Sequence, residues 1–344
     1  MKVGFDVSPL KTGHKTRGIG SYTSNLFKHL KLSPSLEVQE FTNSNEIKNV
    51  DVIHIPYFDL FFNTLKINKN IPTVVTIHDV TPLLFPENYP PGIKGKINYW
   101  FQKKAIKQVD AIITDSENSK KDIQKFLGID PSKIFVIFLA QGENFKVLND
   151  KSLLNKIKQK YNLPDIFALF TGNVNWNKNI LNTAKACIDA GTAVYFVGKS
   201  FESKDNLNHP ELKSYSEFLE NYSNHPKIHT LGYVSDEDLV GIYNLASVTL
   251  LPSFYEGFGI TILESQACGT PVITSNISSM PEVGGNGCLY VDPYDHQSIK
   301  EAILKILSDN SLKARLIKDG FSNVRKFSWK NTALKTIEVY ESIT

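Results

Sequence analysis

One short stretch of the chain constrains the fold more than any other. The continuous apolar run Val248–Leu251 is typical of a buried strand, and a turn containing Gly257 and Gly259 follows it. An apolar pattern beginning at Ile260 then predicts a helix. A strand, a glycine turn and a helix N-terminus together present free backbone N–H groups to an anion. The stretch therefore predicts an α/β unit with an anion-binding turn.

Two carboxylates accompany this turn. Glu256 falls within it, and Glu264 falls about two helical turns later at roughly 3.6 residues per turn, so Glu264 can share a face with residues near the turn. A carboxylate beside a phosphate-binding turn is suited to accepting hydrogen bonds from sugar hydroxyls, which indicates a nucleotide-sugar site. The alternative is that both are ordinary acidic residues favoured by the positive end of the helix dipole.

The sequence that follows favours the first interpretation. A helix that ends at Gly269 leads into a new strand, and a further helix opens near Pro281. Residues 250–292 resemble the donor site of glycosyltransferase family four, a group of retaining, nucleotide-sugar-dependent enzymes with the GT-B fold. The motifs that carry the resemblance are Pro252-Ser253, Tyr255-Glu256-Gly257-Phe258-Gly259, Glu264, Gly269-Thr270-Pro271-Val272-Ile273, Pro281-Glu282-Val283 and Val291-Asp292-Pro293.

Short apolar strands alternate with helical patterns through both halves of the chain, which predicts two parallel sheets covered by helices. We expect an α/β protein with two Rossmann-like, doubly wound domains facing each other across a cleft, as in GT-B. The N-terminal domain is expected to span residues 1–163 on the acceptor side. The nucleotide-sugar domain is expected to span 164–327, and a terminal helix at 328–344 to pack back on the N-terminal domain.

Charge and composition limit the classes of partner. The net charge is only +3, so no nucleic-acid partner is expected, although residues 1–163 hold 23 Lys and Arg against 15 Asp and Glu. The three cysteines form no zinc-ligand pattern, and no Asp-x-Asp triplet ends a strand. We therefore expect no metal and no cofactor apart from the donor substrate.

Two motifs in the first half are candidate site residues. Gly18 and Gly20 open a helix after the first strand, and such a turn lets the backbone approach a diphosphate. The resemblance implies that this glycine pair contacts the donor phosphate, with Arg17 adding positive charge. It also implies that His78, at the end of a strand, lies near the transferred sugar. Asp79 is expected to orient the His78 ring or bind substrate.

The second half supplies the remaining candidates. The resemblance implies that Lys178 neutralises the departing diphosphate, whereas Asn173 stands where many members of the family have an arginine. It also implies that Val234 contacts the nucleobase. Ser235 and Asp238 form a variant of the capping box and so predict a helix start there. The backbone of Phe258, Gly259 and Ile260 is expected to hold the phosphate and the sugar hydroxyls.

Residues 94–107 mix five lysines with aromatic and aliphatic side chains. Such a segment can lie on an anionic membrane. Its place inside a βα unit favours the alternative, in which the aromatic side chains pack into the domain and the lysines face water. The same surface could instead hold the acceptor. We expect a cytoplasmic protein, with peripheral contact at the inner face of a membrane left open.

These features predict a retaining, metal-independent glycosyltransferase. The expected donor is GDP-mannose, with a UDP-sugar as the alternative, and the expected acceptor is a hydroxyl of a glycan or of a lipid-linked sugar. Glu256, His78 and Lys178 are the expected catalytic residues, and Glu264 is expected to hold the ribose. Two other functions stay open: a nucleotide-sugar 2-epimerase of the same fold, and a non-catalytic module that binds nucleotide sugars.

Overall fold

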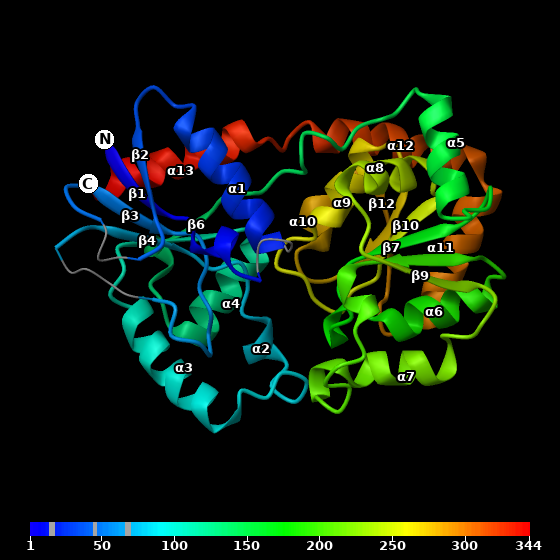
Figure 1. The fold of residues 1–344 in the computed structure, drawn as a ribbon, viewed down its shortest axis with the longest axis horizontal. Helices are drawn as coiled ribbons and strands as arrows, with labels where there is room; N and C mark the ends of the chain where they lie inside the picture. Colours follow the sequence, from blue (N-terminus) through cyan, green and yellow to red (C-terminus); the bar gives the residue numbers. More distant parts are fainter. Residues whose placement is uncertain (14–17, 44–46, 66–69) are drawn as a thin grey trace. The chain divides into compact units, whose positions relative to one another are not determined.

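The structure is a computed structural model that describes residues 1–13, 18–43, 47–65 and 70–344. The chain divides into two compact units (Figure 1). The first comprises Met1–Ala140 and Phe327–Thr344, and the second comprises Gln141–Lys326. Each unit contains a six-stranded sheet in which every pair of neighbouring strands is parallel. The α/β class predicted from the alternating pattern is confirmed.

The sheet of the first unit has the strand order β2-β1-β3-β4-β5-β6. Its strands are β1 (Lys2–Asp6), β2 (Glu37–Phe41), β3 (Val52–Ile55), β4 (Thr73–Thr76), β5 (Ala111–Thr114) and β6 (Ile134–Val136). Its helices are α1 (Gly18–Lys31), α2 (Thr81–Leu84), α3 (Gly92–Ile106), α4 (Glu117–Leu127) and α13 (Trp329–Ile343), with short 3₁₀ turns at Ser8–Lys11 and Pro131–Lys133. Strands β3, β4 and β5 are buried along their whole length, as parallel strands covered on both faces must be.

Helices cover both faces of this sheet. Helices α1 and α13 pack against each other on one face, and α3 and α4 lie on the other (Figure 1). Ile106 of α3 and Ile123 and Leu127 of α4 join the apolar cluster against the strands. The last helix therefore belongs to the first unit although its sequence follows the second.

The sheet of the second unit has the strand order β12-β11-β10-β7-β8-β9. Its strands are β7 (Ala168–Thr171), β8 (Val194–Val197), β9 (Ile228–Gly232), β10 (Val248–Leu251), β11 (Val272–Ser275) and β12 (Cys288–Val291). Its helices are α5 (Lys151–Lys160), α6 (Ile180–Asp189), α7 (Lys213–Asn221), α8 (Asp236–Leu245), α9 (Ile260–Ala267), α10 (Met280–Gly284), α11 (His296–Ser308) and α12 (Asn310–Val324). Short 3₁₀ turns lie at Trp176–Lys178, Lys199–Glu202, Pro210–Leu212 and Gly285–Gly287.

Two apolar clusters sandwich this second sheet. One joins the strands to α6, α7 and α11, and the other joins them to α5 and α8. The predicted helix start at Ser235 is confirmed, because the Ser235 hydroxyl accepts a hydrogen bond from the Asp238 N–H at 3.3 Å.

The boundary between the units lies earlier in the chain than the position after residue 163. The sequence of helix α5 is mostly polar and rich in lysine, yet its Ile157 is buried in the second unit and packs on α8. Gly241 of α8 makes this approach feasible, since a Cβ there would lie 2.2 Å from Ile157 Cδ1. Leu163 joins the same apolar cluster, and the Tyr161 hydroxyl donates to Asp238 at 2.8 Å, so residues 141–163 belong to the second unit.

Helix α3 agrees only in part with the interpretation in which the aromatic side chains of residues 94–107 pack into the domain. Tyr99 and Ile106 pack against the core of the first unit, as the packed interpretation requires. Trp100 and Phe101 do not, because both are exposed. Within the residues that the structure describes, every helix is too short or too polar to traverse a bilayer.

Candidate active site

The strand order of the second unit fixes where a ligand can bind. If the strands are numbered from β7 as 1, the order read from β9 to β12 is 3-2-1-4-5-6. The chain therefore adds strands first on one side of β7 and then, from β10 on, on its other side, so the direction of winding changes between β7 and β10. In open parallel sheets the ligand crevice lies outside the carboxyl ends of the strands at such a switch point. The loops that leave β7 and β10 are the ones that carry the predicted residues Lys178 and Glu256.

These two side chains meet. The Lys178 ammonium group donates to both carboxylate oxygens of Glu256, at 2.7 and 2.9 Å. The side chains are 17% and 11% exposed, so the ion pair is screened from most of the solvent. The Ser253 hydroxyl donates to the same carboxylate at 2.6 Å. The structure thus places two predicted catalytic residues, 78 positions apart, in one hydrogen-bonded group at the switch point.

Side-chain amides beside Lys178 fasten its loop to the backbone of the Glu256 loop and of the segment after β12. The Asn179 amide donates to the carbonyls of Pro252 and Pro293, at 2.8 and 2.7 Å. The Asn177 amide donates to the Tyr255 carbonyl at 2.9 Å, and the Asn177 carbonyl accepts from the Phe254 N–H. Asn177 therefore holds the position of the Lys178 loop instead of supplying charge.

The predicted turn before α9 has the geometry that an anion site requires. Gly259 has a φ of +92°, a left-handed conformation that glycine adopts readily, and it leads directly into Ile260 at the start of the helix. No side chain among the described residues caps this helix end, and of its first turn the Ile262 N–H donates to the Gly259 carbonyl at 3.0 Å. The Ser279 hydroxyl bridges the carbonyls of Glu256 and Phe258, at 2.8 and 2.9 Å, and so fixes the turn.

Glu264 lies about one turn after the start of α9. Its carboxylate accepts a hydrogen bond from the Tyr243 hydroxyl at 2.9 Å, and that hydroxyl also contacts Thr171 at the end of β7. Burial raises the pKa of Glu264 to about 7; the hydrogen bond from Tyr243 opposes this shift, and the negative charge of Asp236 adds to it. Tyr243 was not identified from the sequence, because its contact with Glu264 joins two helices.

Two other predicted residues of the second unit, Asn173 and Val234, differ in their exposure to solvent. Asn173 is exposed, and its side chain accepts from the Asn175 N–H at 3.2 Å. Val234 is buried in the apolar cluster of α5 and α8, so little of its side chain is left for a base. Its neighbour Tyr233 is exposed and donates its N–H to Glu202 at 2.7 Å.

In the first unit, His78 follows β4 and is held by a carboxylate. The His78 Nδ1 atom lies 2.7 Å from a buried oxygen of Asp115, which follows the neighbouring strand β5. Burial lowers the pKa of His78, but the charges of Asp115 and Asp79 outweigh it, so the net shift is upward. Tyr22 of α1 packs edge-on against the His78 ring at 4.7 Å.

The expectation that Asp79 orients the His78 ring is wrong. Its carboxylate instead accepts a hydrogen bond from the Thr81 N–H at 2.8 Å, two residues along the chain. Asp115 takes the orienting position, because parallel strands end at the same edge of the sheet and β5 lies beside β4. The position of Asp115 directly after a predicted strand was the signal that could have identified it.

A buried hydrogen-bond chain extends from this region to the last helix. The Thr76 hydroxyl contacts the Tyr22 hydroxyl at 2.9 Å and His54 Nε2 at 2.8 Å, and His54 Nδ1 contacts the Tyr340 hydroxyl at 2.5 Å. Burial, together with the charge of His78, lowers the pKa of His54 to about 3, so His54 is neutral. Helix α13 is therefore joined by polar contacts to the strands next to His78.

The glycine pair opens α1 as predicted. Gly18 is the first residue of the helix and is exposed, and a Cβ on it would meet no atom within 4 Å. Gly20 is buried two residues later. Arg17 lies outside the described residues.

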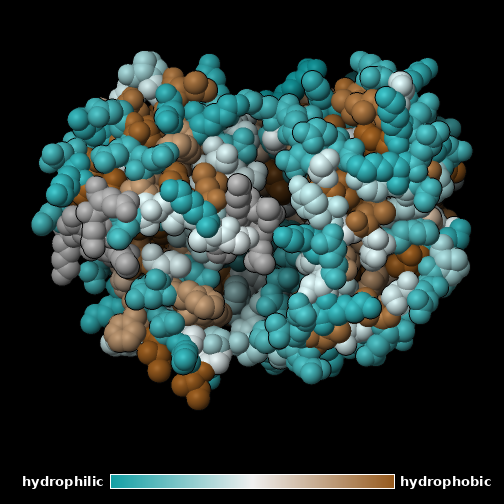
Figure 2. Space-filling model, in the orientation of Figure 1, coloured by the Kyte–Doolittle hydropathy of each residue, from teal (hydrophilic) through white to brown (hydrophobic). Residues whose placement is uncertain are grey.

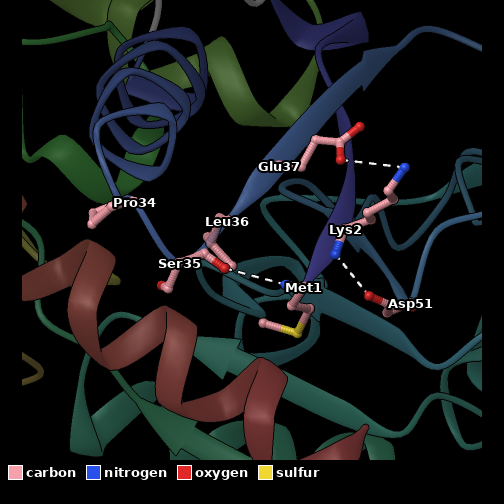
Figure 3. A pocket seen from close by; sticks show the side chains of 7 residues that line it. All are labelled: Met1, Lys2, Pro34, Ser35, Leu36, Glu37 and Asp51. Atoms are coloured by element: carbon pink, nitrogen blue, oxygen red, sulfur yellow. Dashed lines mark hydrogen bonds and ion pairs between the residues drawn. The ribbon is translucent and has the colours of Figure 1, made fainter.

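The sheet of the first unit also has an open pocket at the amino ends of its strands, which is not part of the His78 arrangement. It is lined by residues at the amino ends of β1 and β2, where Lys2 pairs with Glu37 at 3.2 Å and its N–H donates to Asp51 (Figure 3). His78 and Asp115 lie at the carboxyl ends of the strands. Within the described part of the chain, no group of three or more His, Cys, Asp or Glu side chains is placed to share a metal ion.

Comparison with known proteins agrees with this arrangement. Residues 152–322 match the family described as "Glycosyl transferases group 1", and residues 16–139 match "Glycosyltransferase Family 4". Over its full length the fold is similar to the sucrose-phosphate synthase of Thermosynechococcus elongatus, with a TM-score of 0.75 at 17% identity, covering 99% of this chain and 98% of that one. This likeness shows that the two units have the GT-B fold.

Two relatives are mannosyltransferases from Escherichia coli. The O-antigen chain mannosyltransferase B is 30% identical over 281 residues, which cover 78% of this chain and 70% of the relative. The serotype-specific mannosyltransferase WbdA is 30% identical over 280 residues, but these cover only 33% of that longer protein. Family models match both halves of the chain, and the 30% identical relative is covered over 70% of its length. The chain therefore belongs to glycosyltransferase family four.

Proposed function

We propose that the chain is a retaining mannosyltransferase that moves mannose from GDP-mannose to a hydroxyl of a glycan or a lipid-linked sugar. The observation that carries the proposal is the Lys178–Glu256 pair beside the uncapped N-terminus of α9, at the switch point of the sheet. The names of the two relatives support mannose as the sugar. A UDP-sugar is the alternative donor.

The proposed roles follow from charge and hydrogen-bonding capacity. The N–H groups at the start of α9 and the Lys178 ammonium are cationic or partly positive, so they suit a diphosphate. Glu256 positions Lys178 and offers its remaining acceptor capacity to sugar hydroxyls. Glu264 accepts hydrogen bonds from ribose hydroxyls, and His78 contacts the transferred sugar. No metal is proposed, because these groups meet the charge that develops on the leaving diphosphate.

Retention is proposed from the location of these groups. An inverting transfer needs a general base that takes the acceptor proton on the face of the sugar opposite the leaving group. Glu256, Lys178 and the glycine turn are all assigned to the diphosphate side. A leaving phosphate oxygen held there can itself accept the proton from the acceptor hydroxyl on the same face, and the new bond then keeps the anomeric configuration.

Ligand-induced stabilisation tests the donor. A ligand at 100 times its Kd stabilises the folded state by about 2.7 kcal/mol, so the cognate nucleoside diphosphate should raise the melting temperature while the others do not. Glu264→Ala should weaken that nucleotide by roughly 1.5–3 kcal/mol, because the lost hydrogen bonds involve a charged group. Unchanged affinity by calorimetry would remove Glu264 from the site.

Product analysis tests the reaction. NMR of fresh product should show the anomeric configuration of the donor, read from the one-bond C1–H1 coupling because the H1–H2 couplings of the two mannose anomers are both small, and the opposite configuration would contradict retention. Release of an epimerised nucleotide sugar with no acceptor present would favour the 2-epimerase. Tight donor binding with neither transfer nor slow hydrolysis would favour the non-catalytic module.

A further inference from the structure

Helix α3 presents an apolar face to solvent. Among the described residues, the large apolar side chains that this one helix exposes are Ile93, Ile97, Trp100 and Phe101, which are 81%, 54%, 60% and 56% exposed. At roughly 100° per residue they fall within an arc of about 100°. The opposite face, with Gly95, Gln102 and Ile106, is buried. Figure 2 shows apolar surface gathered where α3 lies, at the lower left.

Lysines border this face, which we name the α3 stripe after Ile93, Ile97, Trp100 and Phe101. On the same wheel Lys94 falls at one edge of the stripe and Lys96 at the other, and both are exposed. The Lys104 ammonium lies over the Trp100 ring, 5.5 Å from its centroid. By the same wheel Lys104 lies within the arc of the stripe, and the helix carries no acidic residue, so every charged side chain of α3 in or beside the stripe is a lysine.

The helix is fixed in this orientation by its buried side. The Gln102 amide donates to the carbonyls of Asp59 and Phe62, at 2.9 and 2.8 Å, and the Asn98 amide donates to the Phe61 carbonyl at 2.9 Å. These contacts keep the apolar side chains outward, so the stripe is a constant feature of the folded surface. An exposed apolar face of this kind marks a site of interaction.

We propose that the α3 stripe is a docking surface for an anionic lipid bilayer. Aliphatic and aromatic side chains that enter the acyl boundary, with a rim of lysines at the level of the headgroups, match the chemistry of such a surface. Trp100 suits this boundary because its ring is amphipathic. A protein partner with an apolar groove would need acidic groups to match the rim, and a second copy of this chain would bring like charges together.

Vesicle co-sedimentation tests the proposal with the full chain. Binding should be strong on vesicles of 70% phosphatidylcholine and 30% phosphatidylglycerol, weak on phosphatidylcholine alone, and reduced by 0.5 M salt. Lys94→Gln with Lys96→Gln should weaken binding roughly thirtyfold, if each lysine contributes as surface lysines generally do. The matched control is Lys305→Gln with Lys318→Gln, two exposed lysines of the second unit, which should change binding less than about twofold.

The fluorescence of Trp100 gives a direct readout. Its emission should shift to shorter wavelength when anionic vesicles are added. Trp100→Phe should abolish the shift while binding persists, since Phe keeps the apolar contact. Ile97→Ser with Phe101→Ser should lower the bound fraction about tenfold or more, with circular dichroism confirming the fold.

Two results would overturn the proposal. One is equal binding of the wild-type chain and both sets of α3 variants to anionic vesicles. The other is a change of oligomeric state in the Ile97→Ser, Phe101→Ser variant without lipid, accompanied by no vesicle binding of the wild type; the stripe would then be an interface between copies.

Discussion

The Lys178–Glu256 pair offers the sharpest test of the site. The perturbation is a double-mutant cycle of Lys178→Gln, Glu256→Gln and the double variant, measured without ligand. Two short hydrogen bonds join the charges, and both side chains are mostly buried. Removing one partner leaves the other charge in a poorly solvated place, so each single variant should lose about 2–3 kcal/mol of folding free energy.

The double variant leaves no unpaired charge and should therefore lose less than the sum of the two. We expect a coupling free energy of about 1.5–3 kcal/mol. The assay is urea unfolding, supported by thermal unfolding, where each single variant should lower the midpoint by about 4–12 °C for a unit of this size.

The exposed pair of Lys2 and Glu37 is the matched control. Its atoms are 3.2 Å apart, but the side chains are 53% and 70% exposed, so the same cycle with Lys2→Gln and Glu37→Gln should give a coupling of about 0–1 kcal/mol. A coupling for Lys178 and Glu256 no larger than that of the control would refute the claim that the pair organises the site. In transfer assays Glu256→Gln should reduce kcat about 100-fold or more if Lys178 stabilises the leaving group.

Three further predictions concern pH, the histidine and metal. The pKa of Glu264 is raised to about 7, so the native state binds the proton more tightly than the unfolded chain and folding stability should fall by up to about 3 kcal/mol as pH rises from 4.5 to 7. Glu264→Gln should flatten this fall in urea titrations across that range, and an unchanged slope would show that Glu264 is not the titrating group. Asp115→Asn should move the His78 limb of the pH profile of kcat/KM to lower pH, since the carboxylate that raises the His78 pKa is gone, whereas Asp79→Asn should move it less; equal shifts would deny Asp115 the orienting role. Transfer should survive chelator treatment, and loss of activity that magnesium or manganese restores would contradict metal independence.

The sequence could indicate the parts of the candidate site but not their pairing. Lys178 and Glu256 each stand in a loop after a predicted strand, yet only the strand order, with β7 beside β10, brings the two loops together. Strand order depends on which apolar faces pack, and a list of strands does not contain it. The same reason explains why Asp115 was not predicted as a partner of His78: the two residues are adjacent because β5 pairs with β4.

The sequence by itself determined the local structure of this protein. Apolar runs of strand length produced the two parallel sheets, and the φ of +92° at Gly259 follows from a turn in which a side chain would be strained. The residues of α5 and α3 show what only the tertiary structure decided. Whether Ile157 is buried or Trp100 is exposed depends on the partner that the helix meets, and the composition of the helix does not reveal that partner. Burial is a property of the packed chain, since each helix has one face that the core accepts and another that it leaves to solvent.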